Sequence, residues 1–388
     1  MAKDRPPARD VHRRAEELGR VGDRLGQPFA RPEPRRRAID YLRGLLGDAR
    51  RKSGWQLAEY RGGDRPYGAQ HLPGRADRDA DAVGDDLRAY VLEHLADPGG
   101  VLIADETGFL KKGDKSAGAP GQYSGTAGRI ENCQVGVSPA FAGRHGRAFL
   151  DRELYLPEGW AAGAPRRREA GAPKSVRFAT RPALALRMVE RAPDAGARAA
   201  WVTGDEVYGC DGEPRQALEK RRQPYVLAVR SDQAVCVGLG QLRVKALAGS
   251  APPGARRRLS AGAGAKGPRW YDWACVRVNC PEPGAFARWL LVRRNVSDPE
   301  DLAYYLCGGP PGTPAAGLVR AAGLRWAIEE CLGAAKGEVG LDHYEGRSWA
   351  GWRRHVTLAL FAHALLAVIR SRAAKPARPQ KGGRGSRR

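Results

Sequence analysis

The chain lacks the residue patterns of several common functional sites. Its seven cysteines are scattered without a C-x-x-C pair, and its seven histidines show no mutual metal-binding spacing, so no zinc site is expected. No serine–histidine–acid constellation and no phosphate-binding loop stands out either. The acidic side chains are therefore the candidate catalytic set.

Signals for export and for a membrane are also missing. The first residues, Met1 to Pro7, are polar and do not resemble a signal sequence. An odd number of cysteines without such a signal indicates reduced thiols in the cytoplasm. The most apolar segment, Val356 to Ile369, contains His363 and is too short to span a bilayer. We therefore expect a soluble cytoplasmic protein, with this segment as a core helix and no membrane partner.

Negative charge is scarce relative to positive charge. The 66 lysines and arginines exceed the 43 acidic residues and give a formal net charge of +23. Such an excess attracts a polyanion and makes its binding salt-dependent through counterion release. Ribosomal and nucleoid proteins share this property, so the charge indicates a nucleic-acid partner but not a reaction. The 388 residues allow two or three domains.

Two carboxylates stand at the ends of strongly apolar runs. Asp105 follows the run that begins at Val101, and Asp205 follows the run that begins at Trp201. Runs of this length read as central strands, whose carboxyl ends commonly line the active crevice of an open α/β sheet. Each Asp precedes a Glu, and strand alternation allows only one of the pair to face a shared site. A turn or helix-capping role is the alternative for each Asp.

A third acidic position lies on a predicted helix. Leu318 to Lys336 contains no proline and precedes Gly337, which predicts a helix that stops at this glycine. At about 100° per residue, Arg325, Glu329 and Lys336 share one stripe of that helix. A carboxylate between two cations can hold a divalent metal beside bound phosphates. The alternative is an ordinary ion pair on a solvated face.

Together these residues resemble the DDE transposases of bacterial insertion sequences, in the branch marked by a Tyr-Arg-Glu-Lys signature on the last catalytic helix. Arg325, Glu329 and Lys336 reproduce the last three signature residues, whereas the tyrosine position is Ala322. The three acids are separated by intervals of 100 and 124 residues, and the long second interval is typical of that branch. Further similar stretches are Asp105–Lys112, Gln122–Gly128, Asn132–Gly136 and Trp326–Glu330.

The resemblance implies a ribonuclease-H-like α/β fold, a mixed sheet with an inserted β-rich segment and an N-terminal helical domain. It implies that Asp105, Asp205 and Glu329 are catalytic and hold two Mg²⁺ ions, for which Mn²⁺ can substitute. Arg325 and Lys336 would bind phosphates. The partners would be the terminal inverted repeats of the element and target DNA on the bacterial nucleoid, with a homodimer pairing two ends. The alternatives are a catalytically inactive or host-adopted DNA-binding protein and a nuclease without strand transfer.

The sequence pattern divides the chain into four parts. Residues 1–33 are charged and are predicted to be mobile. Residues 34–98 form a helical domain that either recognises the ends of the element or caps the catalytic domain. Residues 99–374 form the catalytic domain, and residues 375–388 form a basic disordered tail that holds DNA nonspecifically.

The β-rich insertion is predicted at about residues 231–301, with short strands that include Leu242–Leu247, Ala274–Val278 and Trp289–Arg293. Trp270 and Trp273 lie in it among several arginines. This mixture can stack an unpaired base and neutralise its phosphates. The alternative is that the tryptophans pack a small core of the insertion itself.

Overall fold

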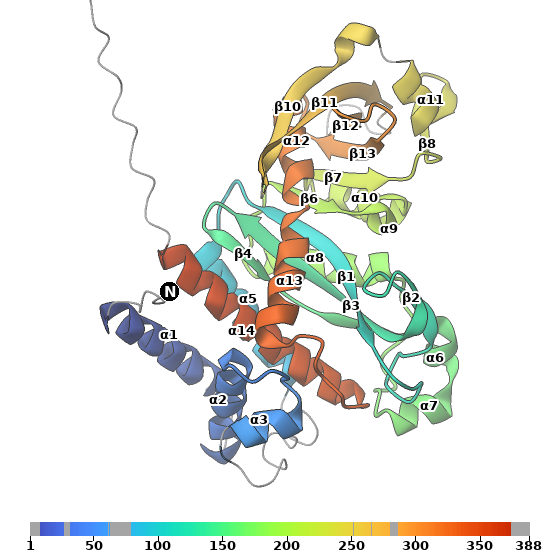
Figure 1. Ribbon diagram of the computed structural model, residues 1–388. Helices are drawn as coiled ribbons and strands as arrows, with labels where there is room; N and C mark the ends of the chain where they lie inside the picture. The colour runs from blue at the N-terminus through green and yellow to red at the C-terminus, as the bar shows by residue number, and fades with distance from the viewer. Residues whose placement is uncertain are drawn as a thin grey trace, which may run out of the picture.

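The computed structural model describes residues 8–26, 32–60, 62, 79–250, 252–264, 266–279 and 286–373. The tail predicted at 375–388 lies outside these residues, as does most of the charged loop before residue 79. Figure 1 shows a large twisted sheet whose faces carry helices, with the N-terminal helices gathered beside the long C-terminal helix.

Within the described residues, four helices precede the sheet. The prediction of a mobile segment at 1–33 is wrong over residues 8–26, which form a helix in which Val21 and Leu25 are buried. Their helical spacing, with Leu18 one turn earlier, supplies an apolar stripe that the many charged neighbours hid in the sequence. The helical reading of the next segment is confirmed. The four helices are α1 (Ala8–Gly26), α2 (Pro32–Leu46), α3 (Gly54–Tyr60) and α5 (Ala80–Leu95).

The N-terminal helices share their hydrophobic core with the sheet. Leu42 of α2 and Leu87 of α5 are fully buried in the same cluster as Ile103 and Phe149 of the sheet. Helix α5 packs along α14 (Trp349–Ala373), which lies against the sheet. This packing agrees with the structural-cap alternative for these helices, and it leaves their contact with DNA as a proposal.

The central sheet is mixed. Strands β6 and β1 are parallel, β7 is parallel to β6, and β3 pairs antiparallel with β1. Parallel strands place their carboxyl ends at one edge, which is where the predicted acids follow. The strands of this part are β1 (Val101–Leu110), β2 (Gly121–Ser124), β3 (Arg129–Gly143), β4 (Gly146–Phe149), β5 (Glu153–Tyr155), β6 (Trp201–Gly204) and β7 (Tyr225–Val229).

The predicted β-rich insertion is present and extends this sheet. Its strands continue the sheet in the order β10-β11-β12-β13, where β13 follows the predicted bounds of the insertion directly and pairs antiparallel with β7. One strand prediction is wrong, because Leu242–Leu247 mostly forms α11 (Val244–Gly249), in which Val244, Leu247 and Ala248 are buried at helical spacing. The strands are β8 (Ala234–Val237), β9 (Gly240–Arg243), β10 (Arg257–Gly264), β11 (Gly267–Val278), β12 (Ala287–Asn295) and β13 (Leu302–Gly309).

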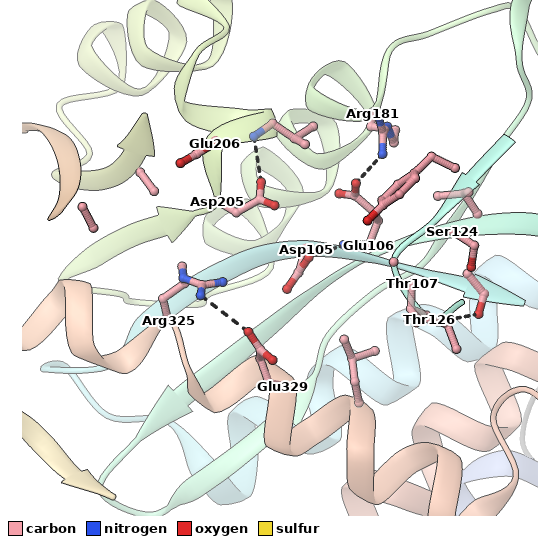
Figure 2. A pocket seen from close by; sticks show the side chains of 18 of the residues that line it. Asp105, Glu106, Thr107, Ser124, Thr126, Arg181, Asp205, Glu206, Arg325 and Glu329 are labelled. Carbon is pink, nitrogen blue, oxygen red and sulfur yellow. Dashed lines mark hydrogen bonds and ion pairs between the residues drawn. The ribbon is translucent and has the colours of Figure 1, made fainter. Parts of the chain in front are cut away.

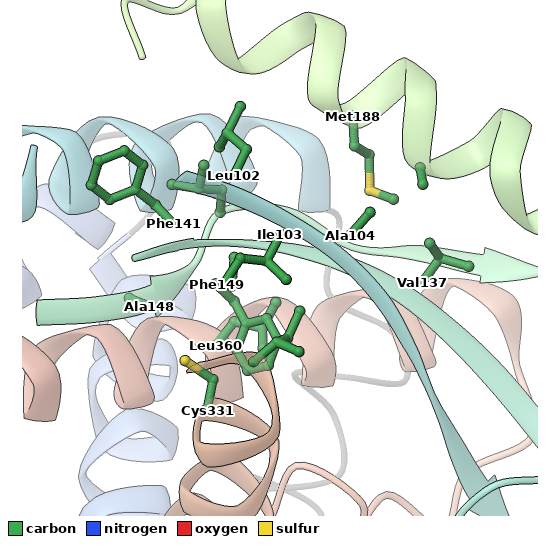
Figure 3. Packing of buried hydrophobic residues seen from close by; sticks show 14 of the residues in the cluster. Leu102, Ile103, Ala104, Val137, Phe141, Ala148, Phe149, Met188, Cys331 and Leu360 are labelled. Atoms are coloured by element: carbon green, nitrogen blue, oxygen red, sulfur yellow. The ribbon is translucent and has the colours of Figure 1, made fainter. Parts of the chain in front are cut away.

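Helices cover both faces of the central strands. In Figure 3, Met188 of α8 packs on one side of β1 and β3, whereas Cys331 of α13 and Leu360 of α14 pack on the other. This arrangement is the expected mixed α/β, ribonuclease-H-like fold. The remaining helices are α6 (Glu158–Ala162), α7 (Ala164–Glu169), α8 (Arg181–Asp194), α9 (Glu206–Gly209), α10 (Gly212–Lys220), α12 (Ala315–Leu324) and α13 (Ala327–Val339), with a 3₁₀ turn at Pro253–Ala255.

The helix that carries Glu329 differs from its predicted form. Instead of one helix over Leu318–Lys336, α12 and α13 are separated by a turn at Arg325 and Trp326. Helix α13 also passes through the predicted stop at Gly337 and ends at Gly340, which adopts a left-handed φ of 65°. A left-handed residue ends a helix efficiently, whereas Gly337 lies inside the last turn with helical geometry.

Two further expectations concern the cysteines and the apolar segment Val356–Ile369. The cysteines within the described ranges form no disulfide. Helix α14 is long and apolar enough to cross a membrane by length and composition, but 61% of its most apolar window is buried inside the protein. The expectation that Val356–Ile369 belongs to a core helix is therefore confirmed.

Candidate active site

Two neighbouring parallel strands bring the first two acids together. Asp105 lies within β1, and Asp205 directly follows β6, which pairs with β1 through Gly204 and Ala104. Both carboxylates line one open pocket of about 750 Å³. The prediction that these strands deliver their acids to a common place agrees with this geometry (Figure 2).

One carboxylate oxygen of each aspartate accepts a hydrogen bond from a backbone amide. Asp105 Oδ1 accepts from the amide of Glu106 at 2.8 Å, and Asp205 Oδ1 accepts from the amide of Val207 at 2.9 Å. Asp205 is thus the N-cap of α9, as the capping alternative proposed. Within the described residues, neither Oδ2 accepts a hydrogen bond, so each aspartate combines a fixed orientation with an oxygen available to a ligand.

Helix α13 supplies the third acid from across the pocket. Glu329 lines the pocket with Arg325 and Lys336, as their predicted common stripe requires. The Glu329 carboxylate accepts from Arg325 Nη2 at 3.5 Å and is about half exposed. Glu330 points elsewhere and pairs with Arg147 of β4. The distinction between the two glutamates therefore follows the 100° turn between successive helical residues.

Lys336, which also lines the pocket, contacts the hairpin that joins β2 to β3. Its Nζ donates to Thr126 Oγ1 at 3.0 Å, and this hydroxyl donates to the carbonyl of Gly108 at 3.2 Å. The hairpin thereby ties the cation to β1, the strand that carries Asp105. Burial lowers the pKa of Lys336 below that of a free lysine, while Asp342 opposes this effect.

Sequence reasoning missed a second layer of the site built around Glu106. Its carboxylate accepts from the Arg181 guanidinium of α8 and from the Tyr208 hydroxyl of α9. Because Tyr208 lies one turn after Asp205, these bonds link the segment that carries Asp205 to the strand that carries Asp105. Arg181 lies 75 residues from Glu106 in the chain, so no local spacing could have identified the pair.

The environment of Asp105 disfavours its charged form. Burial, followed by the charge of Asp205, raises the pKa of Asp105 to about 7. Burial likewise raises the pKa of Glu106, an effect that Arg181 partly offsets. A cation placed between Asp105 and Asp205 would relieve this repulsion.

The donor set fits a hard divalent metal. The three acids offer carboxylate oxygens, the ligands that Mg²⁺ and Mn²⁺ prefer, and Asp105 and Asp205 each keep one oxygen without a protein partner. Within the described residues, no three acidic, histidine or cysteine side chains already form a compact metal cluster. The Glu329 side chain is turned toward Arg325, so its carboxylate would have to rotate to join the two aspartates.

The two predicted DNA-binding tryptophans have different environments. Trp270 is about half exposed on β11, whereas Trp273 is buried and its Nε1 donates to the carbonyl of Leu259 at 3.2 Å. Trp273 packs near Tyr305 in the insertion, as the core-packing alternative states. Trp273 also lines a cavity of about 150 Å³ next to the pocket that contains the acids.

Sequence reasoning gave no separate role to another tryptophan at this cavity. Trp326, in the turn between α12 and α13, is about half exposed and lines the cavity together with Arg325 and Ala322. Ala322 occupies the place of the signature tyrosine, so its small side chain helps to keep this space open. The sequence signal that could have identified Trp326 as a site residue is its position directly after Arg325.

Comparison with known proteins identifies the class to which this fold and site belong. Residues 24–269, more than half of the chain, match the family described as DDE superfamily endonuclease. The chain therefore belongs to this superfamily. The match includes Asp105 and Asp205 but ends before Glu329, whose place in the site rests on the geometry described above.

A relative with a curated description narrows the comparison. The chain is 28% identical over 201 residues to the "Probable transposase for insertion sequence element IS701" of Microchaete diplosiphon. This alignment covers 51% of the chain and 50% of the relative, so the chain spans about half the length of the protein it matches. The resemblance to transposases of insertion sequences is thereby supported.

Proposed function

We propose that the protein is a DNA transposase that cleaves and joins the ends of an insertion sequence. The observation that carries this proposal is the convergence of Asp105, Asp205 and Glu329 on one pocket whose rim also holds Arg325 and Lys336. Family membership supports DNA cleavage, and the relative's description supports transposition. The net charge of +23 supports a polyanionic substrate.

The three acids would hold two divalent metal ions, Mg²⁺ or Mn²⁺. When bound, such ions supply an activated oxygen nucleophile and stabilise the leaving oxygen of an in-line phosphoryl transfer. Asp105 and Asp205 would present their unpaired oxygens, with orientations set by the amides of Glu106 and Val207. Glu329 would complete the ligand set after releasing Arg325.

The two cations beside Glu329 would position the cleaved strand. Arg325, in the turn before α13, and Lys336, on α13, flank Glu329, and each can pair with a phosphate next to the reacting one. Arg325 can bind a phosphate with two parallel hydrogen bonds, whereas Lys336 acts as a compact charge held by Thr126. Phosphate contacts of this kind set the register of the strand but read no sequence.

The aromatic cavity next to Arg325 would accept an unpaired base of the same strand. Trp326 offers a half-exposed ring there, the buried Trp273 forms part of the wall, and Trp270 is exposed on β11. Stacking on aromatic rings contributes about 1–3 kcal/mol per base without sequence preference. By resemblance to the branch with the Tyr-Arg-Glu-Lys signature, such a contact would serve cleavage of the second strand through a DNA hairpin. Two copies of the chain would then pair two terminal inverted repeats.

Replacement of the aspartates tests this function. Asp105→Asn and Asp205→Asn should each lower Mg²⁺-dependent cleavage of an element-end duplex by at least about 100-fold, since even outer-shell changes approach that factor. DNA binding should persist in both variants, with folding checked by circular dichroism. Near-normal cleavage by either folded variant would contradict the assignment.

The products of the unmodified protein separate the remaining alternatives. A transposase joins the cleaved 3′ end to a second duplex, which appears as a longer labelled strand on a denaturing gel. Cleavage without that product would identify a nuclease of the same fold. Binding without cleavage in either Mg²⁺ or Mn²⁺ would identify an inactive DNA-binding protein.

A further inference from the structure

A second cleft lies beyond the active site, toward the carboxyl end of the same strand. It has a volume of about 750 Å³ and lies where the loop after β1, the start of β3, the segment after α13 and Arg51, in the segment before α3, meet. The active-site pocket includes Gly108 of β1, and the second cleft begins at Leu110. The two spaces therefore follow one another along β1.

The walls of this second cleft are rich in cations. Its lining includes Arg51, Lys111, Lys112, Lys115 and Arg347. Three acids also line it, namely Glu131, Asp342 and Glu345. Each of these acids has a basic residue beside it, because Glu131 pairs with Arg129 at 2.6 Å, Glu345 pairs with Arg51 at 3.5 Å, and Asp342 lies 3.9 Å from the imidazole of His343.

The cations differ in how firmly the protein holds them. Lys111 is half-buried, and its Nζ donates to the carbonyl of Tyr344, so it belongs to the floor of the cleft. Lys115 lies 4.0 Å from Glu169. Lys112 and Arg347 are exposed, and neither makes an ion pair with the described part of the chain. These two side chains are therefore available to an external anion.

Strand β1 lines both the active-site pocket and this cleft. Helix α13 contacts β1, with Arg325 and Lys336 at the active-site pocket and the residues that follow the helix at the second cleft. At about 3.3 Å per strand residue, the five residues from Asp105 to the end of β1 at Leu110 span roughly 17 Å, and the two residues beyond it to Lys112 bring the length along the chain to roughly 20 Å. That length corresponds to about six base pairs of duplex at 3.4 Å each.

We propose that this basic cleft binds the phosphate backbone of duplex DNA about six base pairs from the phosphate held at the acids, with Lys112 and Arg347 making the contacts. This inference rests on the proposed DNA-cleaving function and adds a second point of attachment to it. Two such contacts, one at the acids and one in the cleft, fix the direction of the duplex as well as its position. Phosphate contacts of this kind are sequence-independent.

The test compares two double variants that lose the same charge. Lys112→Gln/Arg347→Gln removes the proposed contacts, and Arg187→Gln/Arg198→Gln removes two exposed arginines from α8 and the segment after it. Both are surface changes, and thermal unfolding verifies the fold. Affinity for a fluorescein-labelled duplex of about 30 base pairs and arbitrary sequence is measured without metal by anisotropy, between about 50 and 200 mM salt.

The cleft variant should bind the duplex at least about tenfold more weakly at 0.1 M salt, and the slope of log affinity against log salt should flatten by about 1.8, for two lost phosphate contacts. The control variant should stay within about threefold of the unmodified protein. Equal losses in both variants would overturn the cleft assignment alone. An equal loss of affinity for a single-stranded oligonucleotide would also overturn it, because the cleft would then hold a single strand. Failure of the unmodified protein to bind any duplex would instead refute the proposed function.

Discussion

Glu329 and Glu330 provide a sharp test of the active site, because adjacent residues of one helix have different partners. Glu329 faces the pocket with the two aspartates, whereas Glu330 pairs with Arg147 on the far side of α13. Replacement of each glutamate by glutamine keeps size and helix propensity and removes only the charge. The two variants therefore differ in location alone.

The expected magnitudes follow from these environments. Loss of a metal-holding carboxylate should reduce cleavage by at least about 100-fold, so Glu329→Gln should be inactive within ordinary detection. Arg147 and Glu330 have side-chain exposures of 50% and 48%. An ion pair that exposed contributes at most about 1 kcal/mol, so Glu330→Gln should change activity by less than about fivefold.

The assay is cleavage and joining of a labelled element-end duplex in Mg²⁺, with circular dichroism as the control for folding. Single-turnover conditions keep product release out of the measured rate. An inactive Glu330→Gln together with an active Glu329→Gln would refute the orientation of α13. The roles proposed for Arg325 and Lys336 on the same stripe would fail with it.

Two stability predictions complete the set. Gly323→Ala should lower the free energy of unfolding by about 3 kcal/mol or more, because an added Cβ would lie 1.8 Å from the carbonyl oxygen of Ala261, a backbone atom that cannot rotate away. Gly333→Ala should raise the free energy of unfolding by about 1 kcal/mol through helix propensity, because no atom lies within 4 Å of the added Cβ. Similar urea midpoints for the two variants would contradict the close packing of Gly323 against Ala261. Burial lowers the pKa of His363 to about 4 from an ordinary 6.5, so the unfolded state binds the proton first and stability falls as the pH drops from 6.5 to 4. His363→Leu should reduce that fall by about 3 kcal/mol in urea unfolding at several pH values, and an unchanged pH dependence would refute the buried neutral histidine.

Local patterns predicted the parts of the site that depend on one segment. The apolar runs before Asp105 and Asp205 identified two central strands, and the spacing of Glu329 and Lys336 identified the face of α13 that lines the pocket, which Arg325 reaches from the turn before it. These features depend on strand and helix periodicity, which a single sequence displays directly.

The features that sequence missed depend on contacts between distant segments. The helix break at Arg325 and Trp326 follows Gly323, whose backbone lies against Ala261 of β10. The carboxylate of Glu106 is held by Arg181 and Tyr208 from two other helices. The first helix was missed for a different reason, since its apolar stripe is narrow and its other residues are highly charged. Tertiary packing decided each of these outcomes.

The close contact between α12 and the insertion limits how the molecule can be rearranged. Arg269 Nη2 donates to the carbonyl of Gly323 at 2.9 Å and to that of Ala261 at 3.1 Å, which fastens the end of α12 to the insertion. Glu329 lies less than two helical turns after Gly323, where these hydrogen bonds hold the chain. The insertion also continues the central sheet, because β13 pairs with β7. The insertion is therefore not an interchangeable module. A chimera that exchanges residues 231–301 for another segment would also move the third acid, so the insertion and the helix that carries Glu329 must be transplanted together.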